Sequence, residues 1–276
     1  MFFPFGSLSL FVWAFHMVVY HGVALGFEAL DRSGRLRRFR VRRPERRGWR
    51  ALLPLVLFNQ CCILLPAMLL LERAGLAYAG PRHLNPVWFV ACLPLMGIGH
   101  DVVQYAGHAA MHRLGLRFLG HRVHHGTGAS RAVSACYMHP ADFVFQIVLP
   151  YLVPLVLVGG GGADVAFHLL TVSLGAVGGL YEHSGYDFAP ALAGVGGRGL
   201  LARLARAAAP LASSHAHGQH HRFADVSFSD GFGSPGLCDT LLGTRWDRKR
   251  PPRRGAPPGE ASIGETPPEG APPAAP

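Results

Sequence analysis

The sequence predicts an all-α integral membrane protein with four to five membrane helices and a helical cap on the cytoplasmic side. Half of the residues are hydrophobic and only 15% are charged, whereas soluble domains carry about a quarter charged residues. Several apolar runs reach or approach the ~20 residues that a helix needs to cross a bilayer. Sixteen histidines gather mainly near and beyond the ends of these runs. Together these features predict membrane spans with a histidine-rich region at one membrane face.

Five apolar runs are expected to form the membrane helices. They cover residues 8–30, 49–71, 86–105, 143–158 and 163–181. The first run has no basic residues before it and no clear cleavage site, and it is interpreted as a signal-anchor helix. Four consecutive glycines, residues 159–162, separate the last two runs. Because glycine breaks helices and permits a tight reversal, these two runs predict a hairpin that crosses or re-enters the membrane.

The distribution of arginine predicts the orientation. Ten arginines lie between Arg32 and Arg50, whereas the loop 72–85 holds only Arg73 and Arg82. Because short basic loops stay in the cytoplasm, the first loop is predicted to be cytoplasmic and the N-terminus external. The third helix and the hairpin then place every histidine cluster on the cytoplasmic face.

The chain is expected to divide into three parts. Residues 1–85 would form the N-terminal membrane helices and the basic loop, and residues 86–250 the catalytic domain. Residues 251–276 are rich in Pro, Gly and Ala. This composition cannot bury enough apolar surface to form a core, so the tail is predicted to be disordered.

Three histidine clusters suggest the chemistry. They are His108-x-x-x-His112, His121-x-x-His124-His125 and His217-x-x-His220-His221. Residues three and four apart share a helix face, so each cluster is expected to aim all its imidazoles at one point. These eight imidazoles exceed what one zinc ion needs and suit two metal ions. Spacing alone does not choose among iron, zinc, copper and nickel.

The first cluster extends backward along its helix. Asp101, Tyr105, His108 and His112 recur at spacings of four, three and four and form one stripe. Asp101 would lie in or near the bilayer, where an ionisable residue needs a partner. A carboxylate that orients a ligand imidazole is one such arrangement, and it is the role expected for Asp101.

The alternative to a metal site is a basic, solvated patch near the lipid headgroups. A single H-x-x-x-H fits either interpretation, but three clusters on one membrane face favour metal. His100 is expected to be structural, and His215 remains an open candidate. The other histidines are expected to pack or to lie at the interface; they are His16, His21, His83 and His168.

These motifs resemble those of the fatty acid hydroxylase / sterol desaturase superfamily, from residue 89 to 246 and more loosely back to Asn59. Beyond the clusters, the resemblance rests on the Asp101 stripe, on Tyr137-Met138-His139-Pro140, and on Asp239 followed by Gly243-Thr244. It implies that Asp101, Tyr105 and Asp239 support the site. It also makes His139 a weaker tenth ligand candidate, which could instead form a hydrogen bond within the site.

The segment from Glu182 to Phe188 reads Glu-His-Ser-Gly-Tyr-Asp-Phe and looks like a segment of C4-methylsterol oxidases and cholesterol 25-hydroxylases. In the family a histidine in this region completes the metal shell, which implies His183 as a ninth ligand. Some positions depart from the family pattern: Ala109, Asp142, Cys238 and Ser229-Asp230-Gly231. Because all expected ligands remain, these departures leave only the substrate in doubt.

The resemblance implies a membrane-bound non-haem di-iron oxygenase that uses O2 to hydroxylate, oxidatively demethylate or desaturate a lipid. A sterol such as a C4-methylsterol is the favoured substrate, and a fatty-acyl chain or sphingolipid is the alternative. The implied cofactors are two iron ions, with zinc as an alternative occupant after isolation. The implied location is the endoplasmic reticulum in a eukaryote or the inner membrane in a bacterium.

Electrons would come from an external protein such as cytochrome b5 or a ferredoxin, because the sequence has no G-x-G-x-x-G fingerprint in a suitable context. The basic loop from Arg32 to Arg50 could dock an acidic donor, or it could serve topology and contact anionic lipids. No nucleic-acid partner is expected, and the oligomeric state is left open.

Two rival functions come from other classes. A histidine-rich metal transporter would place ligands within several spans, near the bilayer midplane, whereas these clusters lie at span ends and beyond. A zinc hydrolase would need a general base beside the ligands, and the sequence contains no H-E-x-x-H.

Overall fold

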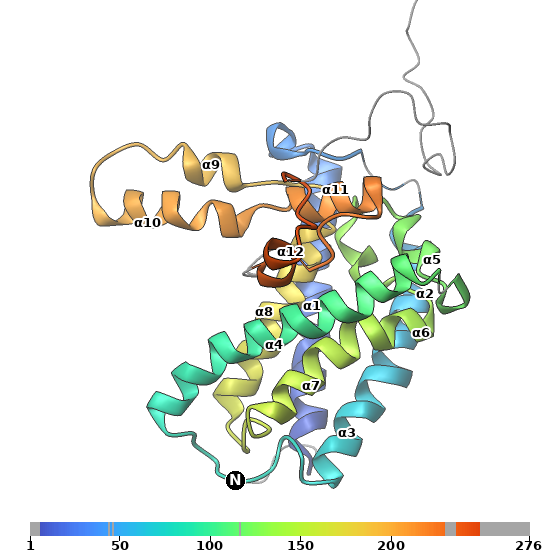
Figure 1. The fold of residues 1–276 in the computed structure, drawn as a ribbon, viewed down its shortest axis with the longest axis vertical. Coiled ribbons are helices and arrows are strands. Elements are labelled where there is room, and N and C mark those ends of the chain that lie inside the picture. The colour runs from blue at the N-terminus through green and yellow to red at the C-terminus, as the bar shows by residue number, and fades with distance from the viewer. Residues whose placement is uncertain (1–5, 44, 46, 116, 230–235, 249–276) are drawn as a thin grey trace, which may run out of the picture.

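The computed structural model describes residues 6–43, 45, 47–115, 117–229 and 236–248, and in this part of the chain all regular structure is helical (Figure 1). The predicted all-α class is confirmed. Two isolated β-bridges, Arg40 with Tyr186 and Ser130 with Ser184, join segments far apart in the sequence. The tail at residues 251–276, predicted to be disordered, lies outside the described residues.

Within the described residues, five helical segments are long and apolar enough to cross a membrane. They follow the five predicted runs, but the third continues past Tyr105 and thereby carries His108 and His112. Two of the segments contain a π-helical turn. The segments are α1 (Leu8–Ser33); α2 (Trp49–Asn59) with η2 (Gln60–Leu64) and α3 (Leu65–Arg73); α4 (Pro86–Arg113); α6 (Pro140–Phe143) with η5 (Val144–Val148) and α7 (Leu149–Leu157); and α8 (Val165–Glu182).

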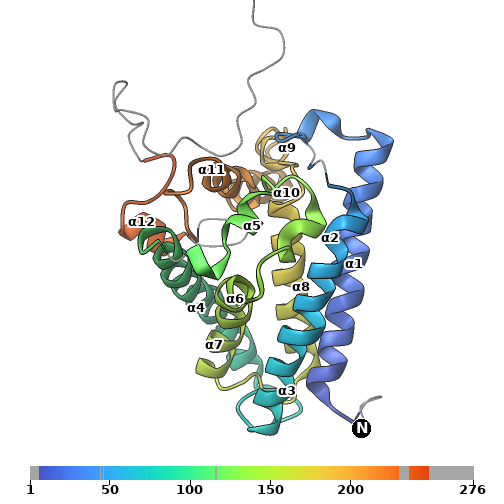
Figure 2. The same cartoon turned by 90° about the vertical axis from the view of Figure 1, so that its right-hand side faces the viewer.

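The shorter helices gather toward one end of the spans and form the expected cap, while the N-terminal end of α1 lies at the opposite end (Figures 1 and 2). The assignment of the cap to the cytoplasm stays a prediction. The cap helices are α5 (Arg122–His125), α9 (Ala189–Ala193), α10 (Leu200–Ala208), α11 (His215–Phe223) and α12 (Leu237–Leu241). The short 3-10 helices are η1 (Arg37–Phe39), η3 (Arg117–Leu119), η4 (Ala132–Cys136) and η6 (Pro210–Ala212).

Polar side chains cap the spans at their starts. The Ser7 hydroxyl accepts a hydrogen bond from the backbone N–H of Leu10 at the start of α1. The Asp164 carboxylate does the same for Phe167 at the start of α8. Such caps satisfy backbone donors that have no partner inside a helix. They therefore fix where each span begins.

Irregular backbone inside the bundle is also satisfied. The fully buried Asn59 side chain donates to the carbonyls of Cys136 (3.0 Å) and Met138 (2.9 Å). The Tyr20 hydroxyl donates to the carbonyl of Val133 and accepts from the N–H of Cys136. Non-helical backbone at membrane depth is tolerated only when such partners are present. These two side chains hold η4 against α1 and α2, next to the loop that follows α5.

The four glycines at residues 159–162 make the turn between α7 and α8, at the end away from the cap. All have positive φ angles, between 58° and 84°. A Cβ atom at Gly160 would lie 2.3 Å from the carbonyl oxygen of Leu76, and one at Gly162 would lie 2.7 Å from that of Pro81. The turn thus approaches the loop after α3 so closely that only glycine fits.

We expect Gly160→Ala to destabilise the protein more than Gly159→Ala. Both substitutions place a side chain in the left-handed region, which costs roughly 1–2 kcal/mol. Only the first also collides with the Leu76 carbonyl, which adds about 1–3 kcal/mol, whereas nothing lies within 4 Å of a Cβ at Gly159. Thermal unfolding in detergent, followed by fluorescence-detected size exclusion, measures both. Equal losses would contradict this packing.

Candidate metal centre

Nine histidines from the cap and the adjoining span ends converge into two groups. Within each group the candidate ligand atoms lie within 4.8 Å of one another. The first group holds His108, His112, His121, His125 and His220, and the second holds His124, His183, His217 and His221. These are the nine residues singled out from the sequence. The structure brings them together, and their role as ligands stays a prediction.

The groups do not follow the clusters, and in this respect the sequence-based expectation was wrong. The cluster around α5 sends His121 and His125 to the first group but His124 to the second. The cluster on α11 is divided the opposite way, with His220 alone in the first group. The physical reason is helical geometry: positions four apart share a face, while adjacent positions differ by about 100°. Each H-x-x-H-H motif therefore serves both groups.

Hydrogen bonds from Nδ1 orient four of these imidazoles. The acceptors are the carbonyl of Phe228 for His108 (2.6 Å), that of Val226 for His220 (2.7 Å), that of Gly179 for His183 (2.9 Å), and the Asp142 carboxylate for His121 (2.9 Å). A carbonyl oxygen can only accept, so the network assigns the proton to Nδ1 and leaves a lone pair on Nε2.

The Nε2 atoms then face one another at 3.0–3.1 Å. For His108 and His121 the distance is 3.0 Å, and both imidazoles already use their Nδ1 proton elsewhere. Such a contact between two lone pairs is repulsive unless a cation lies between them. The donor set therefore fits bound metal ions, for which neutral imidazole is a common ligand.

Burial in the cap favours the neutral form of several of these imidazoles. Burial, reinforced by neighbouring imidazoles, lowers the pKa of most of them far below the ordinary value. Burial also lowers the pKa of His183 to about 4. The strongly lowered pKa values are those of His124, His125, His217, His220 and His221. At neutral pH each of these side chains keeps a lone pair free for a metal ion.

A protein-family model described as fatty acid hydroxylase matches residues 93–244, which is more than half of the chain and includes all nine histidines. The chain belongs to the fatty acid hydroxylase family. No curated protein and no solved structure matches the chain. The family consists of hydroxylases and related oxygenases, and five described helices are long and apolar enough to span a membrane. The protein is therefore an integral membrane enzyme of this family.

The Asp142 carboxylate contacts an imidazole of the first group, a role that the sequence did not predict for it. Its side chain is fully buried, and one of its oxygens accepts from His121. A carboxylate in this position fixes ring orientation and raises the basicity of the other nitrogen. The sequence signal for this role is the position of Asp142, two residues after His139-Pro140, where the family pattern also has an acidic residue.

Asp101 has a different role from the one expected. Its buried carboxylate accepts from the N–H groups of Leu237 and Cys238 and from the Ser229 hydroxyl. It therefore anchors the start of α12 on α4, while Asp142 orients an imidazole. Helix geometry explains the difference, because Asp101 lies almost two turns before His108 on α4, level with α12.

Asp239 and Tyr105 support the site through Phe228. Asp239 is fully buried and accepts from the N–H groups of Phe228 and Ser229. Tyr105 packs edge-on against the Phe228 ring, at a centroid distance of 5.7 Å. The Phe228 carbonyl accepts the hydrogen bond from His108 Nδ1. Both residues therefore help to orient that imidazole.

Three arginines of the basic loop turn toward the cap. Arg42 donates to the carbonyls of Ala129 (2.8 Å), Glu182 (2.5 Å) and Ser214 (3.0 Å). Arg40 donates to the carbonyl of Ser130, and Arg47 to that of Gly126. Arg42 alone thus links the segments that carry His124, His183 and His217. Neither donor docking nor lipid contact, the two roles considered from the sequence, accounts for these side chains.

The remaining histidines lie outside both groups. His139 is exposed, and its Nδ1 accepts from the N–H of Ala141 at the start of α6. His215 contacts Gln219 and packs against Trp246. His16 and His168 are buried within the bundle, as expected for packing residues. Neither open candidate, His139 or His215, joins the nine.

We expect the purified protein to hold about two metal ions per chain in a nitrogen-rich shell. His121→Ala should lower the content by about one ion, from the first group, and His217→Ala by about one ion, from the second. His139→Ala is the matched control and should change nothing. Elemental analysis and X-ray absorption measure both quantities; a sulfur-rich shell, or an equal loss in the control, would contradict the two-group site.

Asp142→Ala and Asp101→Ala should distinguish the orientation of the His121 imidazole from the anchoring of α12 on α4. Loss of Asp142 frees the His121 ring and should weaken metal binding about 10–100-fold, as outer hydrogen-bond partners do elsewhere. Loss of Asp101 should mainly lower the unfolding temperature, because it leaves backbone donors of α12 unpaired. Chelator competition and thermal unfolding, applied to both variants, give the comparison. The opposite pattern would restore the original expectation for Asp101.

Proposed function

We propose that this hydroxylase is a non-haem di-iron oxygenase that uses O2 to oxidise an unactivated C–H bond of a membrane lipid, with a sterol such as a C4-methylsterol as the favoured substrate. The observation that carries the proposal is the convergence of nine imidazoles into two adjacent groups within the family domain. Protein side chains cannot oxidise such a bond, so the hard chemistry must come from a cofactor.

The ligand number of the first group fits a metal ion with more than four ligands, such as iron, better than tetrahedral zinc. The first group offers five nitrogens, which is one more than a structural zinc ion takes. Neighbouring Nε2 atoms are 3.0–3.1 Å apart in both groups. Ligands at right angles with bonds of ~2.1 Å would be about 3.0 Å apart, whereas a tetrahedral arrangement would separate them by about 3.4 Å. When bound, an iron pair would supply O2 activation and hydrogen abstraction.

The protein itself orients the ligand imidazoles, excludes water from the site and gives the substrate access to it. The Nδ1–H groups of His108 and His220 stay bonded to backbone carbonyls, so these rings cannot rotate or take up a proton there. Phe228 packs against both rings and covers this side of the first group. Exclusion of water strengthens every electrostatic interaction inside the site.

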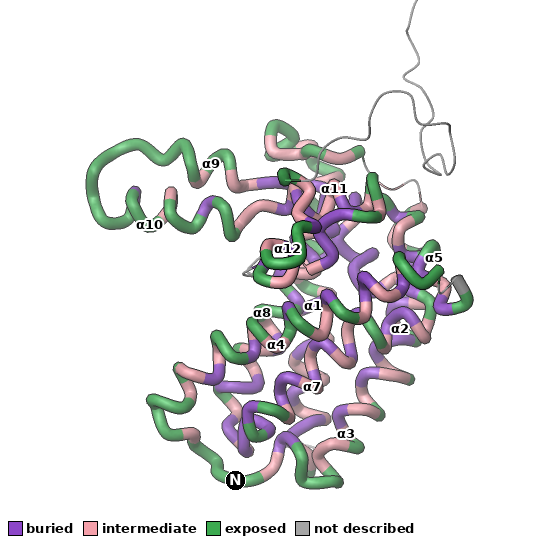
Figure 3. The backbone as a smooth tube through the Cα atoms, in the orientation of Figure 1, coloured by how far each residue is buried: buried purple, intermediate pink, exposed green. Residues whose placement is uncertain are grey.

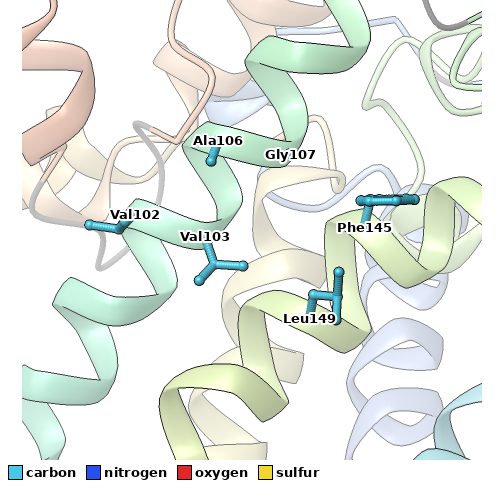
Figure 4. A pocket seen from close by; sticks show the side chains of 6 residues that line it. All are labelled: Val102, Val103, Ala106, Gly107, Phe145 and Leu149. Carbon is cyan, nitrogen blue, oxygen red and sulfur yellow. The ribbon is translucent and has the colours of Figure 1, made fainter. Parts of the chain in front are cut away.

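An apolar pocket of about 290 Å³, partly open to the surface, lies between α4 and the segment formed by η5 and α7 (Figure 4). It is lined only by apolar residues and glycine: Val102, Val103, Ala106, Gly107, Phe145 and Leu149. Gly107 directly precedes His108, and Val102 is 49% exposed on the outer side of the span. This supports lateral entry of an apolar substrate from the bilayer.

One segment of the chain bears on the choice of substrate. The Glu182–Phe188 segment, which resembles that of sterol oxidases, supplies His183 to the second group and supports a sterol over a fatty-acyl chain.

Electrons would come from an external acidic protein such as cytochrome b5 or a ferredoxin. Exposed arginines in the basic loop, including Arg35, Arg37 and Arg38, would supply the positive surface for it. The membrane would be the endoplasmic reticulum or the bacterial inner membrane.

The test is lipid oxidation under 18O2 by the iron-loaded protein in proteoliposomes, with a donor and its reductase supplied. We expect one labelled oxygen in a sterol product, and loss of at least about a thousandfold in His124→Ala and His221→Ala, because a catalytic metal site loses its geometry. His83→Ala, in a loop at the far end, should keep its turnover. Labelled fatty-acyl products would redirect the substrate, and labelled water alone would refute the oxygenase.

A further inference from the structure

The segment between His183 and α11 forms a helical hairpin that projects sideways from the cap (Figure 1). Both ends of the hairpin are attached to one side chain at the end of a membrane span. The Tyr181 hydroxyl, in the last turn of α8, accepts from the N–H of Phe188 (2.7 Å) and donates to the carbonyl of Ala212 (2.8 Å). The base of the hairpin therefore lies at the cap end of the α8 span.

Helix α10 is strongly amphipathic. Leu200, Leu201 and Leu204 are 70%, 83% and 54% exposed, while Ala202 is 8% exposed and is buried toward α9. At 100° per residue the three leucines lie within one 100° arc, and Ala202 lies almost opposite its centre. Leu211, in η6, extends the same apolar row and is 53% exposed. The apolar face of α10 thus points away from α9.

The direction of this face follows from the arrangement of the hairpin. In Figure 1, α9 lies on the outer side and α10 on the side nearer the spans, and Figure 3 shows most of α10 exposed. Since the leucines face away from α9, they face back toward the level of the spans. In a membrane-embedded protein that space holds lipid.

The charge of the hairpin complements a lipid surface. Residues 188–212 contain Arg198, Arg203 and Arg206 and no acidic residue. Arg206 closes the hairpin by donating to the carbonyls of Val195 and Gly197, while Arg198 and Arg203 are exposed. A helix with leucines on one face and arginines beside them is typical of helices that lie in the headgroup region.

We propose that α10 lies in the headgroup layer of the same bilayer that the spans cross, with Leu200, Leu201 and Leu204 at the acyl boundary and Arg198 and Arg203 on anionic headgroups. A soluble protein partner would have to fit between the hairpin and the membrane, which this geometry disfavours. The proposal concerns the surface of the cap and does not depend on the metal or the substrate.

The test uses the full chain in nanodiscs of mixed phosphatidylcholine and phosphatidylserine. A fluorescent noncanonical residue replaces Leu201, and the matched control replaces the exposed Ala191 on α9. Because the apolar face of such a helix reaches about 5–10 Å into the headgroup and acyl boundary, lipids brominated on their chains should quench the probe at position 201 at least about threefold more than the control. Equal quenching at both positions would overturn the proposal.

Two further arms separate lipid from protein contact. Arg198→Gln with Arg203→Gln should reduce the quenching at position 201 in discs that contain phosphatidylserine, while unchanged metal content reports an intact cap. If the probe is instead shielded only when a donor protein is added, or only when two copies share a disc, the surface is a protein interface and the proposal is wrong.

Discussion

The mutual repulsion of imidazole lone pairs is the constraint on which the rest of this structure depends. Four elements, α4, α5, α8 and α11, bring nine imidazoles together with Nε2 atoms 3.0–3.1 Å apart, an arrangement that is favourable only around cations. Since the ligands come from segments far apart in the sequence, metal binding and folding of the cap are coupled. The spans can form from their own apolar surface, but the cap cannot close on an empty centre without cost.

The backbone after α11 shows how firmly the imidazoles must be held. Ala224 and Ser227 have φ angles of 61° and 48°, a left-handed conformation that costs non-glycine residues free energy. The Val226 carbonyl lies between these two residues and accepts a hydrogen bond from His220. The Phe228 carbonyl follows Ser227 and accepts a hydrogen bond from His108. Asp239, which accepts from two N–H groups of the same turn, helps to stabilise it. The strain therefore lies where it fixes two ligand orientations.

The sequence was sufficient for the helices and for eight of the nine histidines, because apolar run length and histidine spacing are local properties. His183 belongs to no spacing motif, and only the resemblance of its segment to the family pointed to it. The sequence was insufficient for the assignment of ligands to groups, since H-x-x-H-H reads as one cluster until adjacent positions are projected about 100° apart. The sequence also did not show that Asp142, and not Asp101, meets an imidazole. The approach of η3 to α6 brings His121 to Asp142, whereas the approach of α12 to α4 brings backbone N–H groups to Asp101. Arg42 lies among ten arginines, and nothing local distinguishes the one that binds three carbonyls from those left exposed.

The crossing of α4 over η5 links the bilayer to the metal centre. A Cβ atom at Gly107 would lie 3.2 Å from the carbonyl oxygen of Phe145, so the two segments touch along their backbones. The π-helical turn begins two residues after Asp142, which orients His121, and Gly107 directly precedes His108. The same crossing therefore lines the apolar cavity on one side and positions two ligands of the first group on the other.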